Sequence, residues 1–149
     1  MTSWWNNPAK SLSGAEAKLE DTHKVKRITN HTLPFDWRTN NCIHSVAEVI
    51  NAYHKCDCID DFGFEFKDSE AANFKELKKK GYKDLVALFD AHMKRKSAKF
   101  AKTGDICVDN NCSGVYQYSH AVFWGNEGLY YLPRSELGIV FDLTTYKAR

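Results

Sequence analysis

The sequence predicts an α+β fold, in which helices come first and pack on a small antiparallel sheet. Two observations predict it. From Cys42 to Met93, apolar side chains recur three and four residues apart, and after Lys102, runs rich in β-branched and aromatic residues alternate with turns. Helices followed by antiparallel strands are typical of α+β domains. The 149 residues suffice for one such domain, which we expect over 31–149, after an N-terminal arm and helix over 1–30.

The N-terminal arm carries apolar residues that it buries poorly by itself. Trp4 and Trp5 are adjacent in an irregular stretch, and the helix expected after them has only a narrow apolar stripe. Such a helix gains little stability without a packing partner, and Trp is favoured at the centres of interfaces. The tryptophans either fold back on their own domain or anchor the chain to a partner. We expect the arm to dock on a neighbouring chain.

A second helix is predicted from Cys42 to about His54. Three good N-cap residues mark its start, namely Thr39, Asn40 and Asn41. Its buried face is predicted from apolar residues at helical spacing, namely Val46, Val49, Ile50 and Tyr53. Cys42 then lies in the first turn, where unpaired N–H groups and the helix dipole favour a thiolate. His44 follows two residues later and points away from it. Because a thiolate is the nucleophile of cysteine hydrolases, Cys42 is the first candidate catalytic residue.

The remaining elements follow in order. After a connector over 56–68, a cap at Asp68 or Ser69 begins a helix over 70–80, and a further helix shows one apolar face up to Met93. The last third is expected to comprise, in chain order, the strand Asp105–Val108, a polar loop over 109–114, the strand Tyr116–Trp124, a hairpin turn over 125–128, and the strands Leu129–Leu132 and Ile139–Leu143.

Charge is small in total but uneven along the chain. Basic residues outnumber acidic ones ten to three over 75–102, and acidic residues outnumber basic ones eight to three over 31–70. The basic segment either meets an anionic polymer or acidic partner, or forms solvated helix faces. No nucleic-acid motif accompanies it, so no specific nucleic-acid partner is expected. No apolar run is long enough for a membrane span.

The cysteines predict neither a disulfide framework nor a cofactor. Five is an odd number, and the spacing favours reduced cysteines in a protein made in a cytosol. Cys56 and Cys58, beside His54, could bind zinc together with Cys107 and Cys112 if the fold gathers them. The Cys-x-Cys spacing is tighter than in most zinc sites. We therefore expect no metal.

Three segments together resemble the NlpC-type branch of papain-like cysteine peptidases. Phe-Asp-Trp-Arg-Thr-Asn-Asn-Cys at 35–42 resembles its aromatic loop before the nucleophile, 103–108 its Gly-Asp strand, and His-Ala-Val-Phe-Trp-Gly at 120–125 its histidine strand. The finer resemblance is to a small NlpC-like family found largely in phage tail gene modules. Its long helical insertion and Gly-Leu-x-x-Leu-Pro return strand are matched here, the latter at 128–133. The resemblance covers about 33–141.

The resemblance implies a papain-like NlpC-type core with Cys42 and His120 as its catalytic pair. Cys42 would attack an amide carbonyl, and His120 would take its proton and later protonate the leaving amine. The third group of such sites should fall near Tyr131 or Leu132. Tyr131 can accept a hydrogen bond from the imidazole, although it is a weak orienter. The distance from the Cys42 sulfur to the His120 ring is the direct test.

The resemblance also implies a biological setting, and the positions at which this chain departs from the family favour an alternative function. It favours a cysteine peptidase or amidase of a phage virion or tail that acts on peptidoglycan peptide bonds. Arg38 and Asn41 replace the Gly and the acid that family members usually carry, and the phage-associated branch need not keep a full triad. The alternative is a catalytically decayed papain-like structural protein of a tail or connector; a weaker one is a host-side effector hydrolase. In the phage setting the arm over 1–30 would bind other tail or virion proteins in an oligomeric assembly, and the protein would reside in the virion after synthesis in the host cytoplasm.

Overall fold

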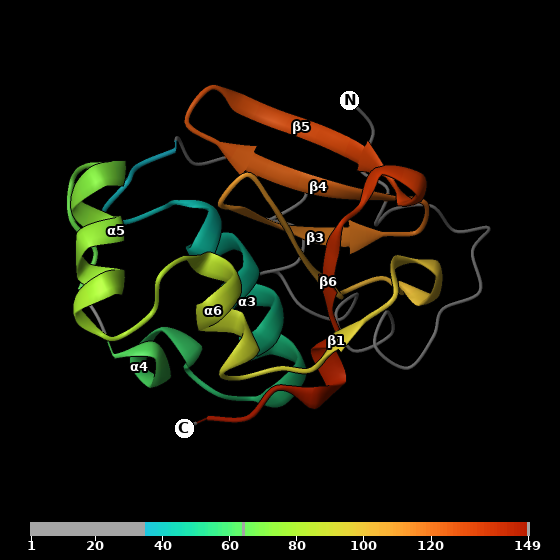
Figure 1. Ribbon diagram of the computed structural model, residues 1–149, viewed down its shortest axis with the longest axis horizontal. Helices are drawn as coiled ribbons and strands as arrows, with labels where there is room; N and C mark the ends of the chain where they lie inside the picture. The colour runs from blue at the N-terminus through green and yellow to red at the C-terminus, as the bar shows by residue number, and fades with distance from the viewer. Residues whose placement is uncertain (1–34, 64, 149) are drawn as a thin grey trace.

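The structure is a computed structural model that describes residues 35–63 and 65–148, in which helices cover a six-stranded antiparallel sheet (Figure 1). The α+β class predicted from the sequence is confirmed. The described helices are α3 (Cys42–His54), α4 (Cys58–Phe62), α5 (Glu70–Lys79) and α6 (Leu85–Asp90), with short 3-10 helices η2 (Ala98–Phe100), η3 (Arg134–Glu136) and η4 (Leu143–Thr145). The strands are β1 (Arg95–Lys96), β2 (Ile106–Asp109), β3 (Cys112–Gln117), β4 (His120–Gly125), β5 (Gly128–Pro133) and β6 (Ile139–Phe141).

The sheet has the order β1-β6-β2-β3-β4-β5, so β2 to β5 form a meander of consecutive hairpins. β6 returns to pair with β2 on its other side. The predicted arm and helix over 1–30, together with their expected docking, lie outside the described residues. In the described part of the chain, no helix has the length and apolar character needed to cross a membrane.

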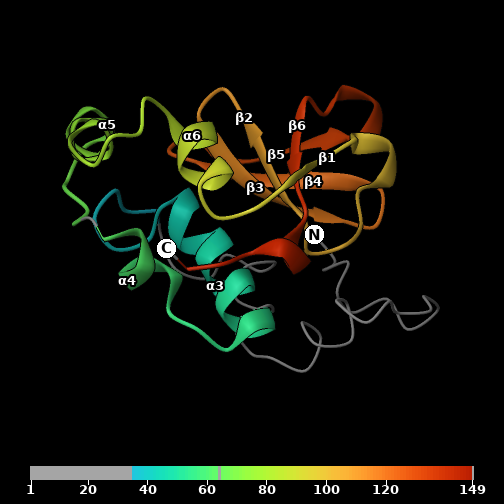
Figure 2. The ribbon, with the colours of Figure 1, turned by 60° about the horizontal axis from the view of Figure 1, so that its bottom comes forward.

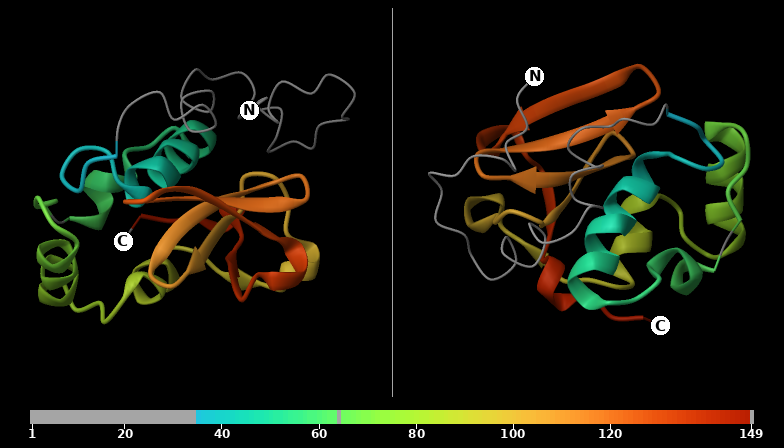
Figure 3. Two further views of the ribbon diagram at one scale, coloured as in Figure 1. Left: turned by 90° about the horizontal axis from the view of Figure 1, so that it is seen from above. Right: turned by 180° about the vertical axis from the view of Figure 1, so that it is seen from behind.

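Helix α3 packs on one face of the sheet, as the views from below and above show (Figures 2 and 3). Its fully buried Val49 and Ile50 belong to the same core cluster as Ile106 of β2 and Val115 of β3. The opposite face has a second, smaller core around Phe123. Strands β2, β3 and β6 alternate their side chains between these two cores, so their register is fixed by what each face buries.

Helices α3 and α5 form where they were predicted, because their capping signals are local. Asn41 caps α3, accepting bonds from the N–H groups of Ile43 (2.9 Å) and His44 (3.2 Å), and His44 Nδ1 accepts the Asn41 N–H (3.2 Å) in return. Ser69 caps α5 in the same way through the N–H of Ala72. The helix expected up to Met93 is shorter and ends at Asp90, and α4 occupies part of the expected connector.

The prediction of a single strand over Tyr116–Trp124 is wrong, because this segment is divided between β3 and β4. Tyr118 adopts a left-handed conformation (φ 57°) and turns the chain between β3 and β4. A tyrosine in such a conformation is uncommon. Because the turn contains no glycine or proline, the sequence gives no signal for it. The polar loop predicted over 109–114 is also wrong, because only Asn110 and Asn111 lie outside the strands. Asn110 and Asn111, both left-handed (φ 46° and 57°), make a two-residue turn, and β3 begins directly after them.

Candidate functional site

The candidate site is built around the thiol of Cys42, at the first residue of α3. The preceding Asn41 is buried and holds the loop before the helix, because its amide also donates to the carbonyl of Trp37 (2.7 Å). Cys42 itself is only 8% exposed. The loop and cap thus place the sulfur at the positive end of the helix, facing the start of β3, as the sequence predicts for its position on α3.

The residues that face the Cys42 sulfur are Cys112 and Ser113. The main-chain N–H of Ser113 donates to the sulfur at 3.5 Å. The neighbouring Cys112 thiol is the largest influence on the ionisation of Cys42: it lowers the pKa to about 7, with help from Ser113 and against the effect of burial. A thiol with this pKa is about half ionised near neutral pH, so Cys42 is a nucleophile in chemical terms.

Cys112 holds its own proton. Its interaction with Cys42 raises the pKa of the Cys112 thiol far above its usual range, and burial acts in the same direction. Tyr130 of β5 lies beside Cys112, and its hydroxyl donates to Asp109 Oδ2 at 3.2 Å. Burial raises the pKa of Tyr130. The site is therefore a thiolate whose neighbours, a thiol and a phenol, both stay neutral.

An aromatic cleft of about 410 Å³ opens over the two thiols. Phe35 packs edge to face on Trp37 (ring centroids 4.8 Å apart) and on Trp124 (5.3 Å), which makes one wall. Glu70 and Glu127 lie on its lining, and among the described residues that line it there is neither lysine nor arginine. The cleft therefore suits a ligand with apolar surface and no negative charge.

The structure does not bring His120 to Cys42. Ser113, beside the Cys42 sulfur, lies opposite the Trp124 end of β4, because the next residue, Gly114, pairs with Phe123. His120 begins β4 at the other end, four residues away, which is about 14 Å along the sheet. In Figure 1, α3 accordingly starts near the arrowhead of β4. The expected catalytic pair is not formed, because the turn at Tyr118 starts a new strand at His120.

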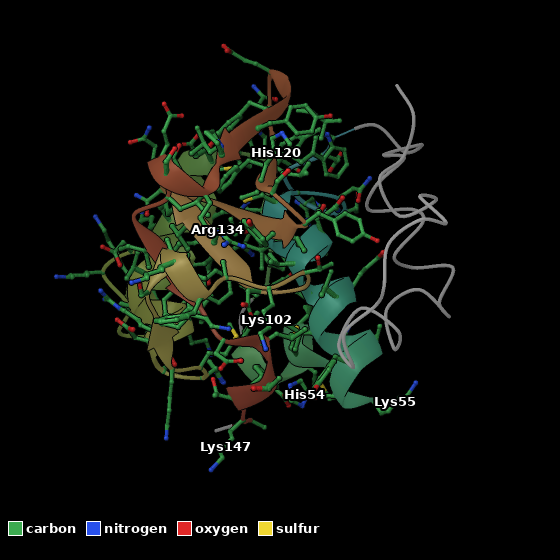
Figure 4. All side chains as sticks on the ribbon, turned by 90° about the vertical axis from the view of Figure 1, so that its right-hand side faces the viewer. His54, Lys55, Lys102, His120, Arg134 and Lys147 are labelled. Carbon is green, nitrogen blue, oxygen red and sulfur yellow. The ribbon has the colours of Figure 1, made fainter. Side chains whose placement is uncertain are left out.

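His120 and Tyr131 are brought together, but away from the thiols. The His120 ring meets Tyr131 edge to face (centroids 6.4 Å), and its Nδ1 lies 2.8 Å from Ser119 Oγ. Burial raises the pKa of Tyr131. Figure 4 shows His120, at the start of β4, well apart from His54, the last residue of α3. Because His120 lies at the end of β4 away from Ser113, its contact with Tyr131 does not reach the nucleophile.

The remaining candidate ligands are dispersed. The Cys58 thiol points to the carbonyl of Ala47 (3.8 Å), Cys107 is buried in the core on the other face of the sheet, and burial raises the pKa of both thiols. Within the described ranges, no three histidine, cysteine or acidic side chains are gathered as metal ligands. His44 packs on Phe66, and burial lowers its pKa to about 4. His44 is therefore a neutral capping residue.

Sequence reasoning missed Tyr130 and Asp109 as site residues, and it considered Cys112 only as a possible zinc ligand. The signal that could have found Cys112 is Asn110-Asn111, a residue pair that favours a tight hairpin turn. Read as a turn, it makes Cys112 the first residue of a new strand next to the Gly-Asp strand. The contact of Cys112 with Cys42, seventy residues earlier, has no local signal.

A family model matches most of the chain. The family model described as a domain of unknown function, DUF6950, matches residues 17–143. No curated protein and no solved structure matches the chain.

Proposed function

The chain belongs to the DUF6950 family, and from the surroundings of its helix-start cysteine we propose that it is a papain-like domain without hydrolase activity that serves as a structural component of a phage tail or connector. The observation that carries this is the identity of the group beside Cys42. It is the thiol of Cys112, and no histidine lines the cleft in the described part of the chain.

The missing histidine matters because amide hydrolysis needs a proton donor. Attack by Cys42 on an amide carbonyl leaves an amine that must be protonated to depart. A group that does this must gain and lose its proton near the working pH. Cys112 and Tyr130, whose pKa values are both raised, hold their protons too tightly for this purpose. The site has a nucleophile and a binding cleft, but neither of the two groups beside the nucleophile can serve as the acid-base group of the reaction.

The phage setting is inferred from the resemblance, and two features of the fold support it. β2 begins directly after Gly104-Asp105, and β5 spans the Gly-Leu-x-x-Leu-Pro segment. Both strands belong to the meander that follows the long helical segment. A cysteine at a helix start against an antiparallel sheet supports a papain-like NlpC-type core. Such folds carry many functions, so the setting itself is a proposal.

The competing function is an active cysteine peptidase or amidase, which the low pKa of Cys42 favours. Purified full-length protein should be incubated with peptidoglycan fragments beside matched Cys42→Ala and His120→Ala variants, with released peptides measured by mass spectrometry. We expect no release above that of Cys42→Ala. Turnover that is lost in both variants would overturn the proposal and restore the Cys42–His120 pair.

The structural role has its own readout. In a particle-assembly assay, the Cys42→Ala chain should support the same yield of complete tails as the natural chain, because assembly does not use the thiol. A chain that assembles normally while both variants lack turnover supports the proposal. Failure of the natural chain to enter particles at all would overturn it.

A further inference from the structure

We propose that Cys42 and Cys112 form a reversible disulfide at the floor of the aromatic cleft, which makes the pair a thiol switch that responds to hydroperoxides. This goes beyond the proposed function and does not depend on it. A structural component without hydrolase activity can carry such a pair, and so can an active enzyme.

The placement of the two thiols carries the inference. Cys112 immediately precedes Ser113, whose N–H contacts the Cys42 sulfur at 3.5 Å, and both cysteines line the same cleft. Both are free thiols in the structure. The Cys112 side chain contacts both core clusters at the end of β3, with its sulfur 3.8 Å from the Ser113 carbonyl oxygen. Cys112 thus lies at the start of β3 with its thiol already beside that of Cys42.

The other cysteines do not share this placement. Cys107 is fully buried on the opposite face of the sheet, and Cys58 is fully buried beneath α3. Cys56 is half-buried near the end of α3, with its sulfur 3.6 Å from Asn51 Oδ1. The cleft that could admit a small oxidant is lined by Cys42 and Cys112 and by no other cysteine of the described chain.

The two thiols are also differentiated in the way that such a reaction needs. Cys42 has the lowered pKa and is the attacking sulfur, whereas Cys112 keeps its proton until it is required. The Cys42 thiolate attacks one oxygen of a hydroperoxide, the O–O bond breaks, and the alkoxide or hydroxide that leaves takes up a proton. Cys42 is then a sulfenic acid.

The second step closes the disulfide. The Cys112 sulfur attacks the Cys42 sulfur, the S–O bond breaks, and the hydroxide leaves as water with the proton that Cys112 gives up. In sum, two thiols and one hydroperoxide give one disulfide, one alcohol or water, and one water. A dithiol reductant reverses the change by exchange.

The experiment treats the full-length protein with a small excess of hydrogen peroxide and follows intact mass and tryptic peptides. We expect a loss of two hydrogen atoms, a cross-link between peptides 39–55 and 103–134, and complete reversal by dithiothreitol. Cys107 and Cys112 share the second peptide, so fragmentation must place the link on Cys112. Cys42 is the only cysteine in the first peptide.

Two variants sharpen the test. Cys112→Ser should give a Cys42 sulfenic acid that dimedone traps and should give no cross-link, whereas Cys56→Ser should cross-link as the natural chain does. Irreversible oxidation of Cys42 without a cross-link in the natural chain would overturn the proposal. A cross-link that joins Cys42 to Cys56, Cys58 or Cys107 would overturn it as well.

Discussion

Replacing Gly114 by alanine tests the pairing of β3 with β4, which sets what faces Cys42. A Cβ atom at this position would lie 2.5 Å from the Val122 carbonyl oxygen and 2.6 Å from Cδ1 of Phe123. Real Cβ atoms essentially never come within 3.0 Å of a neighbour, and the first of these atoms belongs to the main chain of the paired strand. The strands must therefore move apart.

The size of the effect follows from the overlap. Overpacking of this kind costs roughly 1–3 kcal/mol. In a chain of this length it should lower the melting temperature by roughly 2–12 °C. The matched control is Gly138→Ala, since a Cβ atom there would meet no other atom within 4 Å and the φ of Gly138 is ordinary. It should leave stability unchanged or slightly raised. The assay is thermal unfolding followed by circular dichroism. Equal melting temperatures for the two variants would contradict the register in which Gly114 of β3 pairs with Phe123 of β4.

Three further predictions concern the scaffold of the site. Asp105→Ala should lower the free energy of unfolding in urea by about 3–5 kcal/mol, because it leaves the Lys96 ammonium (2.7 Å from Asp105) and the Leu143 N–H (3.0 Å) without their buried acceptor. Asn41→Ala should cost about 1–2 kcal/mol in the same assay through loss of the α3 cap. His44, whose pKa falls from 6.5 to about 4 on folding, binds a proton more readily when unfolded, so its contribution to stability is lost as pH falls from 6.5 toward 4. His44→Gln should remove that part of the pH dependence. If the free energy of unfolding still fell by the same amount between pH 6.5 and pH 4 in His44→Gln, this prediction would be contradicted.

The sequence predicts α3 and α5 well because their signals are local. Asn41 and Ser69 each cap a helix whose buried face repeats at helical spacing, so the starts of α3 and α5 agree with the structure. The Gly125–Gly128 hairpin is found for the same reason, since glycines at both ends of the turn mark it. Helix caps and tight turns depend on neighbouring residues, so they can be predicted from a single sequence.

The site is harder to predict because one turn decides it. Tyr118 turns the chain in a left-handed conformation that tyrosine rarely adopts, and the packing of both sheet faces outweighs that preference. Without the turn, His120 falls within a long strand and can be placed beside Cys42. With it, His120 starts a different strand and Cys112 takes the place next to the nucleophile. The contact across seventy residues is set by sheet topology, which no local pattern records.

The central claim is that Cys112, and not His120, controls the thiol of Cys42. The direct measurement is the rate at which iodoacetamide labels Cys42 as a function of pH, read from tryptic peptide 39–55, in which Cys42 is the only cysteine. At neutral pH a pKa of about 7 in place of 9.0 makes the thiolate roughly fifty-fold more abundant. We expect a midpoint near 7 in the natural chain and in His120→Ala, and a clearly higher midpoint in Cys112→Ala. A midpoint that rises in His120→Ala and stays unchanged in Cys112→Ala would contradict it.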